Sequence, residues 1–491
     1  MKEVAPLYTI PHVSTIKNAL DMKYEAISEV YKKVFSGISH FSITCDIWSE
    51  MMTCRSFLGV TVHYMMDNKL CSTSIEVHEL NERHTGSYVG AQMKELLNKW
   101  NIAEEKVVAF ITDSGANTVS AMHQTFGKDR HIPCFAHLIN LVTDIILKPK
   151  PNKDEQEQHI HHHHISEVIE KVREIVKWVK NSVNQSGELR KLQINAGESS
   201  GIPKKLILDV KTRWNSTYHM LIRFKELAGI LNDLLLFASN APIMVNAVEM
   251  VQIKEIILLL KPLEFITNEL SGESYVTISK VIPLINCLMN NIETINLETD
   301  IVLEAKQQLV AELKKRFGKI EFNSIIAMAT ILDPRFKNVH FKEPRALANA
   351  FAAIKEMMKK ENRHQHPATY TEQIEEKDAN DFWNHHKTLL ENRSRQPKPS
   401  GVEEQLQSYL KHSLAPLSSD PLEEWTKMKA IYPQLYKLAL MFFTVVATSV
   451  PAERLFSKAS FIVSETRNRL LGKRLNKLIF LSTIGENDWF Q

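Results

Sequence analysis

Three carboxylates stand at positions from which a fold could bring them together. Asp46 lies where the strand predicted from FSITCDIW ends, Asp113 directly follows the apolar run VVAFIT, and Glu453 lies just after Pro451, where a helix should begin. Carboxylates at strand ends can converge, and two or three of them can hold divalent cations that promote cleavage or transfer of a phosphodiester. The trio therefore predicts an acidic catalytic site that binds Mg²⁺ or Mn²⁺ through oxygen ligands.

Each carboxylate also has an ordinary structural explanation. An aspartate after a strand is commonly a turn residue or a helix N-cap, and a glutamate in a first helical turn is favoured by the helix dipole without any chemistry. Asp113, for example, precedes the small-residue turn Ser114-Gly115-Ala116-Asn117. For each residue alone a structural role is the better interpretation, whereas the three together favour a metal site.

The elements around the first two carboxylates predict a sheet. Alternation over residues 41–48 predicts a half-buried strand, and FLGVTVHYM and CSTSIEVHEL, separated by the turn residues Asp67 and Asn68, complete an antiparallel meander. SYVGAQMKELLNKW has helical apolar spacing, and VVAFITD predicts a central strand covered on both faces. This is the opening order of a ribonuclease-H-like fold.

From about residue 135 the apolar spacing becomes helical, as in SEVIEKVREIVKWVKNSV and VQIKEIILLLKPLEFITNEL. We therefore expect an α/β plus all-α chain: a ribonuclease-H-like core interrupted by a large helical insertion domain, with the C-terminal region completing the core. The expected parts are a helical lead-in at 1–37, the first part of the core at 38–134, the insertion at 135–422 and the C-terminal region at 423–491. Such an insertion would explain the distance in sequence between Asp113 and Glu453.

Composition excludes some classes of protein. The formal charge of +3 over 491 residues gives no global electrostatic argument for nucleic acid, so such contact must come from local basic stretches. Five cysteines without a C-x-x-C pair indicate neither a disulfide framework nor a cysteine-rich zinc module. The most apolar stretch, LALMFFTVVATSV, is too short to span a membrane, so we expect a soluble intracellular protein with no membrane partner.

Six motifs in order carry a family resemblance: CDIWSE, TDSGANTVSAM, CFAH, KTRWNSTYHML, ATILDPRFK and SVPAERLFSKASFIVSETRNRL. Together they closely resemble the hAT transposase superfamily, particularly its BED-finger transposase-derived proteins, over nearly the whole chain. The resemblance implies that Asp46, Asp113 and Glu453 are the acidic catalytic triad. It also implies that the tract from about Glu423 is a dimerisation region that supplies the last core helices.

The same resemblance implies roles for other residues, each with an alternative. Trp214 of the RW motif would help to hold a displaced base, but it could equally be a packing aromatic, and its neighbour Arg213 would contact DNA. Lys473 and Arg474 on the last helix would meet phosphate, although a solvated basic face is the ordinary explanation.

Two further residues, Cys134 and His137, match the family's C-x-x-H element at the junction of core and insertion. Two ligands are too few for a structural zinc site, so we expect a structural role for both and no structural zinc.

The expected function is that of a nuclear, transposase-derived protein that dimerises through its C-terminal region and contacts DNA or chromatin, with transcriptional regulation as one outcome. Alternatives are an active metal-dependent transposase and an interaction scaffold without DNA binding. The chain starts without the family's BED zinc finger, and Glu50 adds an acid near the triad, so enzymatic activity stays open. Self-assembly and DNA are the expected partners, and no small-molecule substrate is expected.

Overall fold

The computed structural model describes residues 11–50, 54–148, 160–196, 203–211, 213–365, 401–462 and 470–485. The chain divides into two units, and we call them the strand unit and the helical unit. The strand unit combines residues 1–132, 272–283 and 320–491, and the helical unit combines 133–271 and 284–319. The helical unit therefore begins where the insertion was expected, but residues 320–422 group with the strand unit instead of the insertion.

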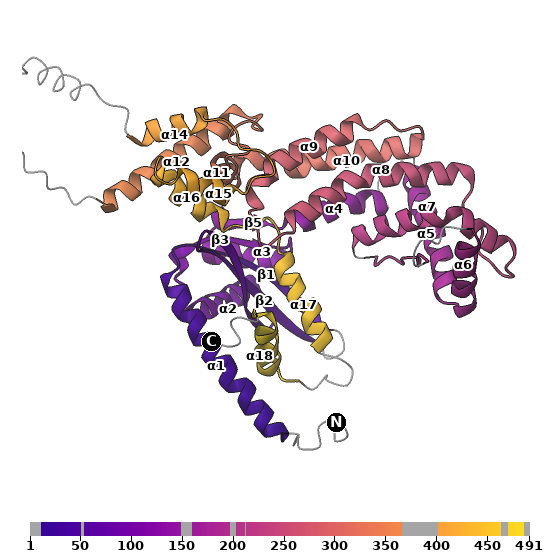
Figure 1. The fold of residues 1–491 in the computed structure, drawn as a ribbon, viewed down its shortest axis with the longest axis horizontal. Helices are drawn as coiled ribbons and strands as arrows, with labels where there is room; N and C mark the ends of the chain where they lie inside the picture. Colours follow the sequence, from indigo (N-terminus) through magenta and orange to yellow (C-terminus); the bar gives the residue numbers. More distant parts are fainter. Residues whose placement is uncertain are drawn as a thin grey trace, which may run out of the picture. The chain divides into compact units, whose positions relative to one another are not determined.

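The strand unit contains one sheet and helices from both ends of the chain (Figure 1). Its elements are α1 (Val13–Gly37), β1 (Phe41–Glu50), β2 (Arg55–Met66), β3 (Lys69–Leu80), α2 (Gly86–Lys99), β4 (Val107–Thr112), α3 (Ala116–Phe126), β5 (His131–Pro133), α11 (Ser324–Leu332), α12 (Pro344–Gln365), α14 (Gly401–Lys411), α15 (Pro421–Met428), α16 (Pro433–Phe443), α17 (Val450–Ile462) and α18 (Gly472–Thr483).

The sheet has five strands in the order β3-β2-β1-β4-β5. β1 pairs antiparallel with β2, β2 pairs antiparallel with β3, and β4 runs parallel to β1. Asp67 and Asn68 form the β2–β3 turn with positive φ angles of 50° and 57°, as the right-handed twist of a hairpin favours. The predicted meander, the helix after it and the central strand are confirmed, and every residue of β4 is buried.

One expectation about β1 is wrong, because the strand is buried on both faces. Its polar residues Ser42 and Thr44 are fully buried, like the apolar residues between them. The Ser42 hydroxyl donates to the backbone carbonyl of Thr444 at 2.6 Å, so the C-terminal part of the chain covers the polar face. The alternation of apolar and polar residues in β1 therefore marks an apolar buried face and a polar buried face, and neither faces solvent.

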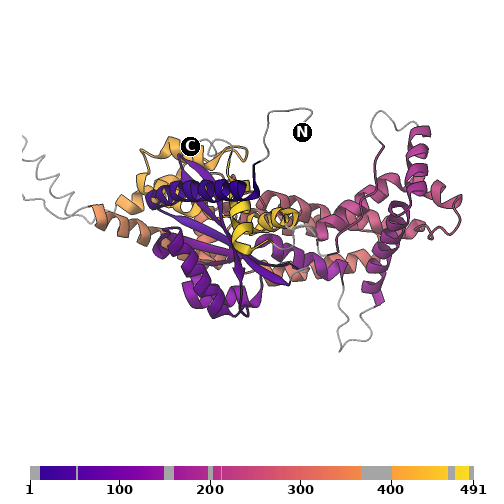
Figure 2. The same cartoon turned by 90° about the horizontal axis from the view of Figure 1, so that it is seen from below.

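The main core of the strand unit lies on the other face of β1. Phe41 and Ile43 pack in one apolar cluster with side chains of α1, α2, α3 and α18. Tyr24 of α1 meets Phe480 of α18 edge-on, with ring centroids 5.3 Å apart. Figure 2 shows α1 and α18 lying side by side against the sheet. The predicted contribution of the last helices to the core is thus present in the structure.

The motif ATILDPRFK joins two of the three segments of the strand unit, residues 272–283 and 320–491. Asp333, fully buried, accepts two hydrogen bonds from the Arg335 guanidinium at 2.9 and 2.7 Å and one from the Ser279 hydroxyl at 2.6 Å. The ammonium of Lys337, 2% exposed, donates to the carbonyl of Tyr409 at 2.7 Å. This motif, for which the sequence offered no role, holds the two segments together through the bond between Ser279 and Asp333. Its buried charges are satisfied by the Arg335–Asp333 ion pair and by the backbone carbonyl that accepts from Lys337.

The helical unit consists of α4 (Phe135–Leu147), α5 (Ile160–Lys180), α6 (Val183–Asn195), α7 (Trp214–Leu236), α8 (Ala247–Leu270), α10 (Asp300–Phe317) and most of α9 (Val281–Thr294). Asn246 and Glu249 form a reciprocal capping box that begins α8. In the parts of the chain that the structure describes, no helix has the length and apolar character required to cross a bilayer.

Candidate acidic site

Strand pairing brings Asp46 and Asp113 to neighbouring positions. Cys45 of β1 is aligned with Thr112 of β4, and these strands are parallel. The next residue along each chain segment is an aspartate: Asp46 lies within β1, which continues to Glu50, whereas Asp113 directly follows the last residue of β4. The expectation that Asp46 ends its strand is therefore wrong, but the parallel register still places the two aspartates at neighbouring positions on adjacent strands.

A tight turn shapes the surroundings of Asp113. The Gly115 N–H donates to Asp113 Oδ1 at 3.1 Å, and α3 begins at the following residue. A Cβ on Gly115 would come within 3.0 Å of the same oxygen, so glycine leaves space around the carboxylate. Asp113 thus has the turn role that the sequence allowed, without losing its place beside Asp46.

Helix α17 supplies Glu453 from the far end of the chain. Its contacts are with β1 and β2, and Glu453 lies in its first turn. One turn later the Phe456 ring stacks on Trp48 of β1, with centroids 5.8 Å apart and planes 21° from parallel. Gly59, the β2 residue paired with Asp46, provides the space for that ring, because a Cβ there would lie 2.7 Å from Phe456 Cε1. The helix can approach the sheet beside Asp46 because residue 59 has no side chain.

The electrostatics of the site show that the three carboxylates interact. Burial, together with the negative charges of Asp113 and, to a smaller extent, Glu453, raises the pKa of Asp46 from 3.8 to about 7. The N–H of Ile47, which donates to Asp46 Oδ1 at 2.8 Å, opposes this rise. Close like charges in a half-buried place favour protonation or a bound cation.

The donor chemistry suits a hard divalent cation, since all three groups are carboxylates. Among the residues that the structure describes, however, no three Asp, Glu, His or Cys side chains are arranged as ligands of a metal ion. Asp46, Asp113 and Glu453 are therefore neighbours in charge and position, and metal binding by them stays a prediction.

Glu50, the additional acid of the CDIWSE motif, does not point to solvent. It is 6% exposed and is paired in register with Arg55 of β2. Its negative charge contributes to the raised pKa of Arg55, after the larger effect of Glu79. Glu50 is therefore balanced by a local cation.

A buried chain of hydrogen bonds supports the sheet face below the acidic site. The Ser72 hydroxyl donates to the carbonyl of Glu273 at 2.8 Å, so it must accept from His63 Nδ1 at 2.7 Å, which leaves His63 Nε2 to accept from Thr44 at 3.1 Å. The Glu273 carboxylate pairs with Arg454 at 2.7 Å, and Arg454 is the residue after the third acid. This series of hydrogen bonds was not predicted from the sequence. The only indication of it is that the polar residues His63 and Ser72 occur within strands that also carry apolar residues.

Trp214, which was expected either to hold a displaced base or to pack as an ordinary aromatic, is buried. It is 3% exposed at the start of α7, and its ring lies 6.5 Å from that of Tyr218. An unpaired base needs an open ring face, so in this conformation Trp214 packs in the helical unit and does not stack on DNA. Arg213 beside it is exposed and stays a candidate for phosphate contact. The Ser216 hydroxyl, which donates to the Arg213 carbonyl at 2.6 Å, holds the turn in place.

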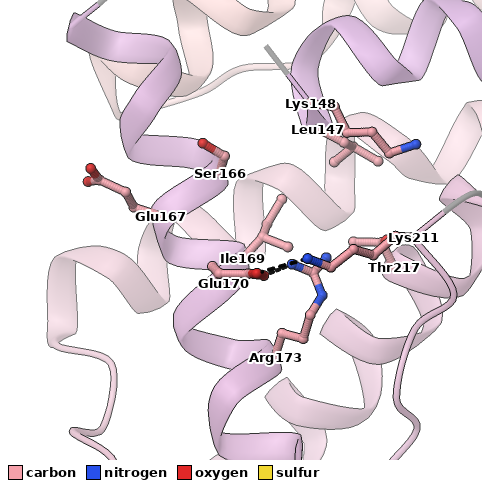
Figure 3. Close-up of a pocket in the computed structure, with 9 residues that line it drawn as sticks. All are labelled: Leu147, Lys148, Ser166, Glu167, Ile169, Glu170, Arg173, Lys211 and Thr217. Carbon is pink, nitrogen blue, oxygen red and sulfur yellow. Dashed lines mark hydrogen bonds and ion pairs between the residues drawn. The ribbon is translucent and has the colours of Figure 1, made fainter. Parts of the chain in front are cut away.

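A pocket of about 380 Å³ lies beside this turn and is lined by Leu147, Lys148, Ser166, Glu167, Ile169, Glu170, Arg173, Lys211 and Thr217. Figure 3 shows Glu170, Arg173 and Lys211 pointing toward one another. Arg173 also binds Asp209 through two hydrogen bonds of 2.7 and 2.6 Å, and Lys211 pairs with Glu170 at 3.1 Å. Because its cations are paired, the pocket is not prepared for an anion.

The two basic residues predicted on α18 differ in their surroundings. Lys473 is exposed, whereas Arg474 donates to both oxygens of Asp21 on α1 at 2.9 Å. Lys477 pairs with the same aspartate at 2.7 Å. Arg474 therefore ties α18 to α1, and a phosphate contact at this position stays a prediction.

Cys134 and His137 lie at the start of the helical unit. Cys134 is fully buried and precedes α4, while His137 is half-buried in the first turn of that helix. Their positions agree with structural roles.

The apolar residues of the C-terminal region mostly face inward. Leu475, Ile479 and Leu481 are buried, and Leu478 is half-buried. Among the described residues of this region, three large apolar side chains point outward: Ile431 between α15 and α16 is 60% exposed, Phe461 at the end of α17 is 89% exposed, and Leu471 just before α18 is 75% exposed.

Comparisons with known proteins match two parts of the chain to family models. Residues 132–256 match the ZBED1 RNase-like helical domain, and residues 405–483 match the hAT family C-terminal dimerisation region. The first match begins where the helical unit begins, and the second includes α14 to α18.

Similarity to curated proteins extends over more of the chain. It is 23% identical over 499 residues to zinc finger BED domain-containing protein 4 of Homo sapiens, an alignment that covers 98% of the chain and 41% of that protein. It is 25% identical over 299 residues to the transposable element Hobo transposase of Drosophila melanogaster, covering 59% and 39%. It is 19% identical over 468 residues to zinc finger BED domain-containing protein RICESLEEPER 3 of Oryza sativa subsp. japonica, covering 88% and 59%. The chain thus spans between 39% and 59% of the length of these relatives.

Proposed function

Because the chain belongs to the hAT transposase superfamily, we propose that it is a transposase-derived nuclear protein that self-associates through its C-terminal region and contacts DNA or chromatin. The match of residues 405–483 to a dimerisation region supports self-association. Exposed Lys473 and Arg213 are the residues proposed to meet phosphate.

We further propose that the sheet is a ribonuclease-H-like core. The support is its order β3-β2-β1-β4-β5, with three antiparallel strands followed by a strand parallel to β1. Helices α17 and α18 return to this core after the helical unit has been completed. In this arrangement the acidic site is assembled from both ends of the chain.

A second function, metal-dependent cleavage and joining of DNA, is favoured by one observation. After burial, which is the largest cause, the charges of Asp113 and Glu453 both raise the pKa of Asp46, so each of these two acids lies within electrostatic reach of Asp46. A sheet with only a structural role does not need carboxylates that repel one another, whereas a cation-binding site brings carboxylates together because the cation neutralises their charge.

The protein's own residues would prepare this chemistry. Asp46, Asp113 and Glu453 would hold Mg²⁺ or Mn²⁺, which when bound would stabilise the charge that develops on the attacking and leaving oxygens of a phosphodiester. The Gly115 N–H orients Asp113, and the Phe456 stack on Trp48 fixes the helix that carries Glu453. The covered face of β1 limits the access of water below the acids.

The test of the acidic site measures cation binding and DNA cleavage separately. Mn²⁺ titration should raise the melting temperature of the wild-type protein, and this effect should disappear in Asp46→Asn and in Glu453→Gln. Asp129→Asn, which neutralises an exposed acid of the same unit, is the matched control and should keep the effect. Cleavage of hairpin and end-containing DNA should follow the same pattern if the protein is an enzyme.

Two results would decide among the alternatives. A melting temperature that Mn²⁺ leaves unchanged, together with no cleavage, would remove the catalytic proposal. DNA binding that is absent even at low salt would remove the DNA-contact proposal and favour an interaction scaffold.

A further inference from the structure

Helix α8 exposes a regular seam that its own unit does not use. The seam consists of Val251, Lys254, Leu258, Lys261, Phe265 and Asn268. These residues are separated alternately by three and four positions, which is the heptad spacing of a coiled-coil contact surface. Leu258 is 50% and Phe265 58% exposed, Val251 is half-buried, and the three polar residues are exposed. We call this set the α8 seam.

The opposite side of α8 is committed to the helical unit. Its buried apolar residues are Ile253, Ile256, Leu259, Leu260, Leu263 and Ile266. Within the unit α8 contacts α4, α5, α7 and α10. Glu249 pairs with Lys171 at 2.6 Å, which anchors the start of the helix. The α8 seam is therefore a narrow outward stripe on a helix that is already rigidly packed.

The seam alternates apolar and basic positions. Val251, Leu258 and Phe265 occupy one heptad position, and Lys254, Lys261 and Asn268 occupy the other. Among the described residues neither lysine has an acidic partner within 4.0 Å, whereas Asn268 donates to Glu264 of its own helix at 2.7 Å. The two lysines are seven residues apart and so lie about 10 Å apart along the helix, on the same face as the apolar groups.

This pattern discriminates among possible occupants. In a parallel pair of α8 seams each lysine would face its own copy, and in an antiparallel pair each would lie against an apolar residue without a counter-charge. A phosphate backbone would pair with the lysines but would leave Leu258 and Phe265 uncovered. An acidic helix with apolar residues of matching spacing covers the apolar side chains and pairs both ammonium groups.

We propose that the α8 seam is the docking surface for an acidic amphipathic helix of a partner protein. The partner presents apolar side chains to Val251, Leu258 and Phe265 and carboxylates to Lys254 and Lys261. Contact over residues 251–268 needs a partner helix of about 27 Å, which is between two and three heptads. Pro262 lies beside the seam, and α8 continues through it to Leu270.

The test uses two matched peptides and the full chain. The first is an Ala-rich helical peptide of about 21 residues, three heptads, with leucine and glutamate at the seam positions; the second has lysine in place of each glutamate. Fluorescence anisotropy should show that wild-type protein binds the acidic peptide at least tenfold more tightly than the basic one. The double variant Lys254→Glu with Lys261→Glu should reverse this preference, and Leu258→Asp should weaken both peptides at least tenfold.

The matched control is Lys177→Glu with Lys225→Glu, which makes the same change of charge at exposed positions on α5 and α7. It should keep the wild-type preference, and circular dichroism should show unchanged helix content in every variant. Three results would overturn the proposal: no binding of the acidic peptide, equal preference after the charge reversal, or tighter binding of duplex DNA with the same dependence on the two lysines.

Discussion

The ring of Phe456 occupies the space where a side chain at Gly59 would lie: a Cβ at residue 59 would come within 2.7 Å of Phe456 Cε1 and 2.8 Å of Cζ. Gly59 is paired with Asp46 on the neighbouring strand, and Phe456 lies one helical turn after Glu453. A missing side chain on a central strand therefore controls how closely the third acid approaches the first. The geometry of the acidic site therefore depends on Gly59, a residue without a side chain.

Gly59→Ala should destabilise the strand unit by about 1–3 kcal/mol, because the Phe456 ring, held against Trp48, must move to make room. Urea unfolding measures the loss. Phe456→Leu should recover part of it in the double variant, since the smaller side chain leaves space for the new methyl group.

Gly229→Ala provides the matched control, because Gly229 lies within α7 and a Cβ there meets no atom within 4 Å. Alanine should raise stability at that helical position by up to about 1 kcal/mol. Equal behaviour of Gly59→Ala and Gly229→Ala would show that α17 does not depend on close approach to β2.

The buried His63 should make the strand unit sensitive to mild acid. Burial lowers the pKa of His63 from 6.5 to about 3, so in that range the unfolded chain binds a proton that the folded protein rejects. Stability should therefore be full above pH 6.5 and should fall below it, with a contribution of about 1.4 kcal/mol per pH unit from this one group. Urea unfolding at pH 7.5, 6 and 5 measures the slope.

His63→Gln, whose amide can both donate to Ser72 and accept from Thr44, should flatten this slope by about one proton. His412→Gln changes an exposed histidine and should leave the slope as it is. An identical slope in wild type and His63→Gln would contradict the assignment of a neutral, buried His63.

Salt dependence should separate Lys473 from Arg474. Each phosphate contact contributes about 0.9 to the slope of log affinity against log salt, so Lys473→Ala should reduce the slope for duplex DNA by about that amount. Arg474→Ala should lower the melting temperature and change the slope little, because Asp21 already holds the guanidinium. If the slope changes with Arg474→Ala but not with Lys473→Ala, the phosphate contact belongs to Arg474 and the assignment to Lys473 is wrong.

Self-association should depend on Phe461 and Leu471. Phe461→Asp with Leu471→Asp places charges on the two most exposed large apolar side chains of the described C-terminal residues and should shift the protein toward monomer in light scattering at micromolar concentration. Leu236→Asp, at a 70% exposed position on α7, is the control and should leave the mass unchanged. A wild-type protein that is already monomeric under these conditions would refute the proposed interface.

Local sequence patterns were sufficient to predict the elements of the sheet and the two aspartates. Alternation and apolar runs defined β1 to β4, and the turn at Asp67 and Asn68 has the positive φ angles that such a hairpin requires. These elements depend on residues near one another in sequence. The parallel pairing of β1 with β4, which makes Asp46 and Asp113 neighbours, joins segments far apart in sequence and was expected from the order of the elements in a ribonuclease-H-like fold.

Features that depend on distant partners could not be predicted. The hydrogen bond that buries Ser42 joins residues 402 positions apart, and the partner of Arg474 lies 453 positions away on α1. Trp214 is an aromatic residue of the type that stacks on bases, but the packing of α7 buries its ring. A basic or aromatic residue in a motif does not reveal whether its side chain has been used inside the fold.

The contact between Ser42 and the Thr444 carbonyl can form only late in the synthesis of the protein. Ser42 leaves the ribosome 402 residues before its acceptor, which at about 5–20 residues per second is a delay of roughly 20–80 s. During that interval the polar face of β1 has neither its hydrogen-bond acceptor nor the helix that carries Glu453. A message that ends before residue 450 yields a chain without α17 and α18, and therefore without Glu453 and without the side chains of α18 that pack in the main core.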